Sequence, residues 1–219
     1  GGASITDYAV EYSSNSGTSW TVFADGTSSL TSTTVTGLTN GTAYIFRVRA
    51  QNSEGYSPYS TQSASVTPST TAVAPTSLTA TYSDAQVSLS WTAPADNGGA
   101  SVTDYAVQYS SNGGTTWTTF TDGTSTSSSA TVTGLANGTA YVFRVAAINA
   151  AGTGSYSTPS TSVTPRTVPT APLNLAGVKG DLQVSLSWDA PSDAGGASIT
   201  DYAVEYSSNS GTSWTVFAD

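Results

Sequence analysis

One sequence block returns at a fixed spacing, and this repeat constrains the fold more than any other feature of the chain. The block Gly-Gly-Ala-Ser begins at residues 1, 98 and 195, so successive copies are 97 residues apart. Residues 1–25 and 195–219 are identical, whereas residues 98–122 differ from both at several positions, so two kinds of unit alternate. A solenoid repeat spans about 20–45 residues and depends on its neighbours. The longer period predicts tandem domains that each have a core of their own.

The middle unit has the pattern of an all-β domain. Val87, Leu89 and Trp91 alternate with polar residues, which is the period of a strand with one buried face. Asn112-Gly113 is typical of a hairpin turn. Strands are predicted within residues 78–80, 87–91, 105–109, 117–120, 130–133, 141–146 and 161–164. About seven short antiparallel strands in a unit of this length indicate a two-sheet Greek-key sandwich.

Three motifs of the middle unit resemble the fibronectin type III domain. They are Trp91 on the second strand, the alternating run 105–109 on the third, and the run from Leu135 to Tyr141 before the sixth. The resemblance implies that Tyr141 closes a tyrosine corner by hydrogen bonding to nearby backbone. A chain rich in Ser and Thr and free of Cys is similar to bacterial cell-surface and secreted members of this family. Those members often serve as spacers, adhesin stalks or linkers beside carbohydrate-active domains.

We therefore predict an all-β chain of tandem Greek-key β-sandwiches, which are fibronectin type III-like and immunoglobulin-like. Residues 72–165 form the one complete unit. Residues 1–68 form a partial unit that holds strands C to G, and residues 169–219 form a partial unit that holds strands A to C′. Proline-rich linkers join the units, and because prolines make such linkers extended and stiff, we expect the shape of a beaded rod.

The partial units leave two explanations open. In the first, the sequence is a window cut from a longer array of units. In the second, the C-terminal part of one chain completes the N-terminal part of the next by strand addition. Each explanation predicts a linear assembly.

Composition excludes several classes of function. Five Lys and Arg residues against 14 Asp and Glu residues disfavour binding to nucleic acid or to anionic membranes. The chain has no His and no Cys, so it lacks imidazole bases, thiolate nucleophiles and thiolate metal ligands. No apolar run reaches the roughly 18 residues of a membrane-spanning helix. We expect a protein that is not an enzyme and that needs no cofactor.

Carboxylates before the third strand of each unit are candidates for a cation site. Asp7, Asp104 and Asp201 occupy this position, and Asp96 and Asp193 lie in the loop before it. A calcium loop needs about six to eight oxygens at a defined spacing, and that spacing does not occur in this chain. We interpret these residues as solvated loop carboxylates, with a weak cation site as the alternative.

Two acidic pairs are candidates for catalysis. Asp7 and Glu11 share one strand face, as do Asp201 and Glu205. Residues at i and i+4 of a strand lie ~13 Å apart along the backbone, which is wide for the two carboxylates of a glycosidase. We predict no catalytic, cofactor-binding or metal-binding residue in this chain.

Tryptophan and asparagine residues are candidates for binding or modification. Trp20, Trp117 and Trp214 either stack on a sugar or neighbouring domain, or pack over the edge of the sandwich. Asn40 and Asn137 begin Asn-Gly-Thr, which fits a glycan acceptor site. The same Asn-Gly pairs also occur where the tyrosine-corner turn favours them, and we favour the turn.

These patterns predict a non-catalytic structural repeat segment of an extended extracellular or cell-surface fibre, stalk or sheath. Its expected partners are neighbouring repeats, other copies of the chain, or a carbohydrate or cell-surface protein. One alternative is an adhesion module that binds carbohydrate or protein. Another is a spacer in a secreted polysaccharide-active enzyme.

Overall fold

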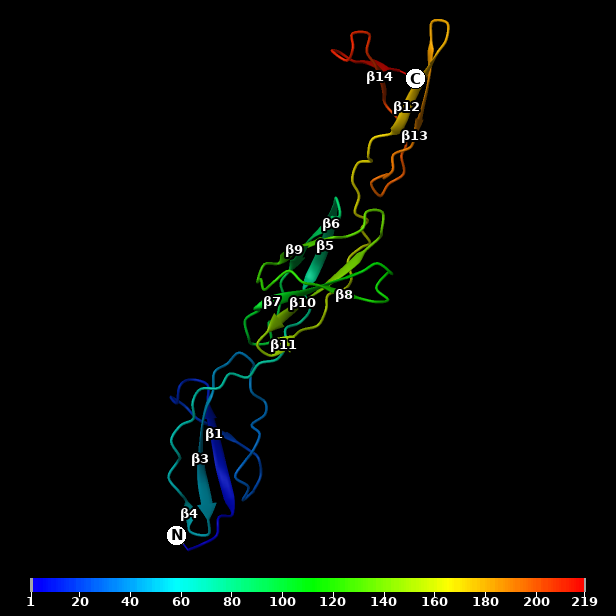
Figure 1. The fold of residues 1–219 in the computed structure, drawn as a ribbon. Coiled ribbons are helices and arrows are strands. Elements are labelled where there is room, and N and C mark those ends of the chain that lie inside the picture. The colour runs from blue at the N-terminus through cyan, green and yellow to red at the C-terminus, as the bar shows by residue number, and fades with distance from the viewer. Residues whose placement is uncertain (1, 219) are drawn as a thin grey trace.

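The computed structural model describes residues 2–218, which form strands and no helix. This confirms the predicted all-β class. Figure 1 shows three β-rich bodies that follow one another along the chain, with the two termini at opposite ends. The part of the chain that the structure describes contains no helix that could cross a membrane.

The middle unit consists of two antiparallel sheets. The order of the first sheet is β5-β6-β9, with β5 (Thr76–Ser83), β6 (Gln86–Thr92) and β9 (Ser129–Thr133). The order of the second is β11-β10-β7-β8, with β7 (Asp104–Ser110), β8 (Thr118–Phe120), β10 (Val142–Asn149) and β11 (Gly152–Thr153). The pairs β6-β9 and β7-β10 join strands that are distant in sequence, as in a Greek key.

The core of the middle unit lies between these sheets. Val87, Leu89 and Trp91 of β6 are buried while the residues between them are exposed, because alternate strand residues point to opposite faces. They meet buried side chains of β7 and β10, and the rings of Trp91 and Tyr105 pack edge to face with centroids 5.1 Å apart. Each such side chain contributes roughly 1.5–3 kcal/mol by burial.

The last predicted strand, residues 161–164, does not form. Val163 makes only an isolated bridge to Tyr141. Instead, every third N–H group of this segment donates to a carbonyl of β10 or of Tyr141 just before it. The pairs are 154 to 147, 157 to 145, 160 to 143 and 163 to 141. The hydroxyls of Ser157 and Ser160 accept hydrogen bonds from the N–H groups of Val145 and Phe143 (both 3.1 Å). A three-residue period is that of an extended polyproline-type segment, so a search for two-residue alternation missed it.

The first unit repeats the second sheet of the middle unit. Its strands β1 (Asp7–Ser13), β2 (Thr21–Phe23), β3 (Ile45–Asn52) and β4 (Gly55–Tyr56) lie in the order β2-β1-β3-β4. The third unit has two separate hairpins, β12 (Leu173–Lys179) with β13 (Val184–Asp189) and β14 (Val204–Tyr206) with β15 (Thr215–Phe217). Val48 and Leu186 are 36% and 43% exposed, whereas their counterparts Val145 and Leu89 are 0% and 2% exposed. Burial therefore requires both sheets.

Both tyrosines at the expected corner positions accept a backbone hydrogen bond from five residues upstream. The N–H of Ala136 donates to the Tyr141 hydroxyl (3.2 Å), and the N–H of Thr39 donates to the Tyr44 hydroxyl (3.0 Å). The bond from Thr39 lowers the pKa of Tyr44, and burial opposes this shift. The corner that the family resemblance implies is thus present in two units.

Candidate functional site

The most organised group of polar side chains lies on the outer face of the first unit's sheet. We call it the Arg–aromatic ladder, and its members are Trp20, Arg47, Tyr59, Arg49 and Tyr56. The Arg47 guanidinium carbon lies 4.1 Å from the Trp20 ring centroid and 4.0 Å from that of Tyr59. The Arg49 guanidinium carbon lies 4.0 Å from the Tyr56 centroid and 4.7 Å from that of Tyr59. Each cation is held between two rings, and a cation–π contact contributes about 0.5–1 kcal/mol at an exposed site.

The backbone explains why the ladder forms. Arg47 and Arg49 are two residues apart on β3 and therefore share one face. Residues 57–63 run beside β3 with hydrogen bonds at every third residue, since the N–H groups of Ser57, Ser60 and Ser63 donate to carbonyls 50, 48 and 46. Two residues of β3 therefore span the same length as three residues of the neighbouring segment. As a result, Tyr56 and Tyr59, three residues apart, lie beside Arg47 and Arg49, which are two residues apart. The serine hydroxyls accept bonds from the β3 N–H groups at 46, 48 and 50.

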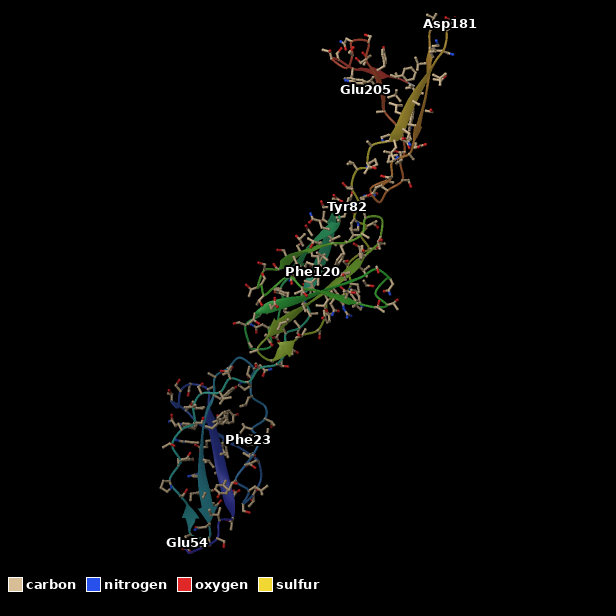
Figure 2. The ribbon with its side chains drawn as sticks, viewed as in Figure 1. Phe23, Glu54, Tyr82, Phe120, Asp181 and Glu205 are labelled. Atoms are coloured by element: carbon tan, nitrogen blue, oxygen red, sulfur yellow. The ribbon has the colours of Figure 1, made fainter. Side chains whose placement is uncertain are left out.

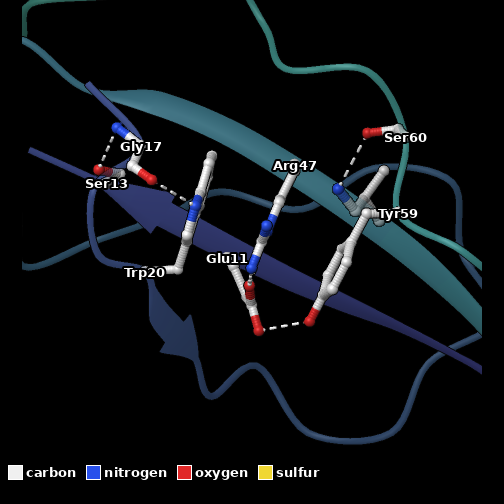
Figure 3. Close-up of polar contacts among 8 residues, drawn as sticks. Glu11, Ser13, Gly17, Trp20, Arg47, Tyr59 and Ser60 are labelled. Carbon is white, nitrogen blue, oxygen red and sulfur yellow. Dashed lines mark hydrogen bonds and ion pairs between the residues drawn. The ribbon is translucent and has the colours of Figure 1, made fainter. Parts of the chain in front are cut away.

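Glu11 anchors the ladder from β1 (Figure 3). It lies opposite Arg47 in the strand register, and its Oε2 accepts hydrogen bonds from Arg47 Nη2 (2.6 Å) and Nε (2.8 Å). Its Oε1 accepts the Tyr59 hydroxyl (2.5 Å). The bond from Tyr59 lowers the pKa of Glu11; burial opposes this shift and Arg47 adds to it. The same bond raises the pKa of Tyr59. With both oxygens engaged, Glu11 is unsuited to act as a general base.

The middle unit has a shorter ladder, in which an uncharged residue accepts the hydrogen bonds of the arginine. The Arg144 guanidinium carbon lies 4.2 Å from the Trp117 centroid and 4.3 Å from that of Tyr156. Gln108 replaces the glutamate, and its Oε1 accepts hydrogen bonds from Arg144 Nη2 (2.7 Å) and Nε (2.9 Å). Ala146 stands where the first unit has Arg49, so this ladder has a single cation.

Two of the three candidate tryptophans, for which sugar stacking and edge packing were the alternatives, form part of a ladder. Trp20 is half-buried, Arg47 covers one face of its ring, and its Nε1 donates to the carbonyl of Gly17 (3.1 Å). Trp117 is covered by Arg144 in the same way. Trp214 is 61% exposed. The first two offer at most one ring face to a ligand.

The candidate carboxylates are not brought together into a metal site. Each accepts a backbone hydrogen bond from its own loop or from a neighbouring one: Asp7 from Ser28, Asp104 from Ser125, Asp96 from Gly98, Asp193 from Gly195 and Asp201 from Tyr202. Residues 2–218 hold no group of three or more His, Cys, Asp or Glu side chains that could bind a metal ion. Carboxylates that accept backbone N–H bonds in this way stabilise turns.

The side chain of Asn137 bonds to the turn between β5 and β6. Its Nδ2 donates to Asp84 Oδ1 (2.7 Å), and its Oδ1 accepts the N–H of Ala85 (2.9 Å). A glycan on this nitrogen would replace the bond to Asp84. Asn40 is exposed.

Sequence reasoning found the tryptophans and Glu11 but missed the ladder that joins them. The signal was present as Ser57-x-x-Ser60-x-x-Ser63 with Tyr56-x-x-Tyr59. It has a period of three, which neither a strand nor a helix search detects.

Comparison with known proteins gives the family. The model of the fibronectin type III domain matches residues 1–66 and 73–163. Fibronectin type-III domain-containing protein 3a of Gallus gallus is 32% identical over 186 residues, which cover 79% of this chain and 15% of the relative. Exoglucanase B of Cellulomonas fimi is 36% identical over 194 residues, which cover 82% of this chain and 17% of the relative.

A third relative extends the match to almost the whole chain. Titin of Drosophila melanogaster is 28% identical over 223 residues, which cover 98% of this chain and 1% of the relative. The chain thus spans less than a fifth of the length of these relatives. With tandem matches to the family model over most of its residues, the chain belongs to the fibronectin type III family.

Proposed function

We propose that this chain is a non-catalytic structural segment of an extended array of fibronectin type III units, located outside the cell or at its surface. The observation that carries the proposal is the end-to-end succession of units (Figure 1) that repeat in sequence every 97 residues. Units placed end to end give the protein a large length, and an array of domains can hold other parts of an assembly apart without any further chemistry.

The polar chemistry of the units supports this role. The one ion pair among the described residues, Arg47 with Glu11 at 2.6 Å, ties β1 to β3, and the Tyr59 hydroxyl bonds to the same carboxylate. These contacts engage both carboxylate oxygens of Glu11 and stiffen one sheet face.

The relatives support two versions of the role. The similarity to titin supports the version in which this chain is a segment of a long structural protein. The similarity to exoglucanase B supports the version in which this chain is a spacer inside a secreted polysaccharide-active enzyme. In that version another domain performs catalysis. In both versions the units connect and hold apart other parts of an assembly.

The mass of the native polypeptide under denaturing conditions tests the proposal. The 219 residues of this chain account for 22.1 kDa, and we expect a native mass several times larger, with an extended shape in small-angle scattering. A native protein that is short and globular would refute the proposal that the units act as an extended spacer.

A second candidate function is binding of carbohydrate or a cell-surface protein through Trp117, whose side chain is half-buried and has Arg144 stacked on one ring face. A glycan array probed with the chain tests it. Binding lost in Trp117→Ala, with folding intact, would support this function, and no binding to any glycan or cell surface would refute it.

A further inference from the structure

Two glycines of the middle unit contact the backbone of the first unit and of the linker. A Cβ at Gly99 would lie 2.2 Å from the backbone nitrogen of Gly41, in the Asn-Gly turn of the first unit. A Cβ at Gly98 would lie 2.1 Å from the carbonyl oxygen of Thr70 in the linker. Real Cβ contacts are never this short, and backbone atoms cannot rotate away as a long side chain can. Only glycine therefore fits at either position.

The same contact recurs between the middle and third units. A Cβ at Gly196 would lie 2.4 Å from the backbone nitrogen of Gly138, and a Cβ at Gly195 would lie 2.3 Å from the carbonyl oxygen of Thr167. These four residues follow their counterparts by 97 positions. We call each set, a Gly-Gly pair with the Asn-Gly turn and linker that it meets, a joint.

The linker of the first joint is attached to both units. The Gly41 N–H donates to the carbonyl of Pro68 (2.9 Å), which holds the start of the linker on the first unit. The Thr70 N–H donates to the carbonyl of Gly98 (2.9 Å), and the Nδ2 of buried Asn149 donates to the carbonyl of Thr70 (2.8 Å). A linker held in this way differs from a flexible tether, whose ends move independently.

The second joint has matching bonds and one further contact. The Gly138 N–H donates to the carbonyl of Pro165 (2.9 Å), and the Thr167 N–H donates to that of Gly195 (2.8 Å). Tyr82 lies at the end of the middle unit that faces the third unit (Figure 2), and the Arg166 guanidinium carbon lies 4.4 Å from its ring centroid.

We propose that the Gly-Gly pair and the Asn-Gly turn are the two halves of a unit-to-unit docking interface that fixes the angle between consecutive units. The partner that it accepts is the Asn-Gly end of another unit of this kind. This inference deepens the proposed function and relies on it for its biological use, since a fixed angle makes an array a stiff rod.

Distances between spin labels in the full chain test the interface. The chain has no Cys, so Thr61→Cys and Thr131→Cys place one label on each side of the first joint, both at exposed positions. We expect a single narrow distance distribution in pulsed electron paramagnetic resonance. Gly99→Ala should widen this distribution at least twofold, because a methyl group forces Gly41 away.

Gly123→Ala is the matched control. Gly123 also has φ +82°, but a Cβ there meets nothing within 4 Å, so this variant carries the same backbone strain without the clash. Its distribution should equal that of the parent. If Gly99→Ala fails to fold, Gly41→Ala tests the opposite half, where a Cβ would lie 3.0 Å from the Cα of Gly99. A broad distribution in the parent, or no widening in the joint variants, would overturn the inference.

The two proposals fail separately. A loose joint in a native polypeptide of high mass would refute the interface and leave the structural array standing. A narrow distribution in a short native protein would refute the array and leave the interface standing.

Discussion

Replacing Trp91 is the most direct probe of the middle unit's core. The side chain is 6% exposed, lies on the central strand β6, and packs edge to face on Tyr105. A large aromatic side chain buries about 200 Å², which at about 25 cal/mol per Å² corresponds to roughly 5 kcal/mol. Alanine retains a small part of this area, while the cavity that it leaves adds a cost. We expect Trp91→Ala to lower the free energy of unfolding by roughly 3–5 kcal/mol.

The indole nitrogen of Trp91 makes a second variant informative. Nε1 is buried and has no hydrogen-bond partner within residues 2–218. A buried donor without a partner costs about 1–3 kcal/mol, so Trp91→Phe removes an unfavourable group together with some packing. We expect Trp91→Phe to cost less than about 1.5 kcal/mol, because the two changes oppose each other.

Urea unfolding followed through the amide NMR signals of β10 measures both variants. These signals report on the middle unit alone, which matters because the chain contains several units and does not unfold in one step. A Trp91→Ala variant that unfolds at the parent's urea concentration would refute the core assignment. If Trp91→Phe costs as much as Trp91→Ala, the argument from the unpaired nitrogen is wrong.

Four further predictions concern hydrogen-bonded side chains. Tyr141→Phe removes the corner bond and should cost about 1–2 kcal/mol in urea unfolding; an unchanged midpoint would contradict the corner's role. Ser160→Ala removes a buried acceptor and should cost about 1 kcal/mol, whereas Ser162→Ala, at an exposed position outside the three-residue period, should cost nothing measurable. The lowered pKa of Glu11 means that its contribution to stability is present above the ordinary glutamate pKa of about 4.3 and is lost as the pH falls through the lowered folded-state pKa. In thermal melts at pH 2 to 7, Glu11→Gln should flatten this acid-side loss; an equally steep loss would assign it to other carboxylates. The raised pKa of Tyr59 means that its contribution to the stability of the fold is present below the ordinary tyrosine pKa. This contribution is lost as the pH rises through the raised folded-state pKa.

The two kinds of unit differ most in the anchor of the ladder. Glu11 forms an ion pair with Arg47, while Gln108 bonds to Arg144 with the same geometry and no charge. The first unit therefore presents an ion-paired ladder with two arginines, and the middle unit presents a shorter ladder with one. Neighbouring units therefore share one fold and one type of joint and present different surfaces.

The sequence by itself determined the class of fold and the repeat. Alternation at Val87, Leu89 and Trp91 predicts a half-buried strand, because side-chain direction along a strand depends only on backbone geometry. The tyrosine corner, whose bond spans five residues, was predicted from the family resemblance. Such features are local, or recur in the family, and need no knowledge of what packs against them.

Only the tertiary structure decided three further features. Whether a valine is buried depends on the opposite sheet, as the exposed Val48 and the buried Val145 demonstrate. The ladder forms because two residues of β3 lie beside three residues of the neighbouring segment. The sequence around Arg47 or around Tyr59 taken alone therefore does not predict it. The requirement for glycine at Gly99 comes from Gly41, a residue of another unit. Each of these features is a relation between atoms distant in sequence, and a period read along one strand carries no information about the partner that the strand meets.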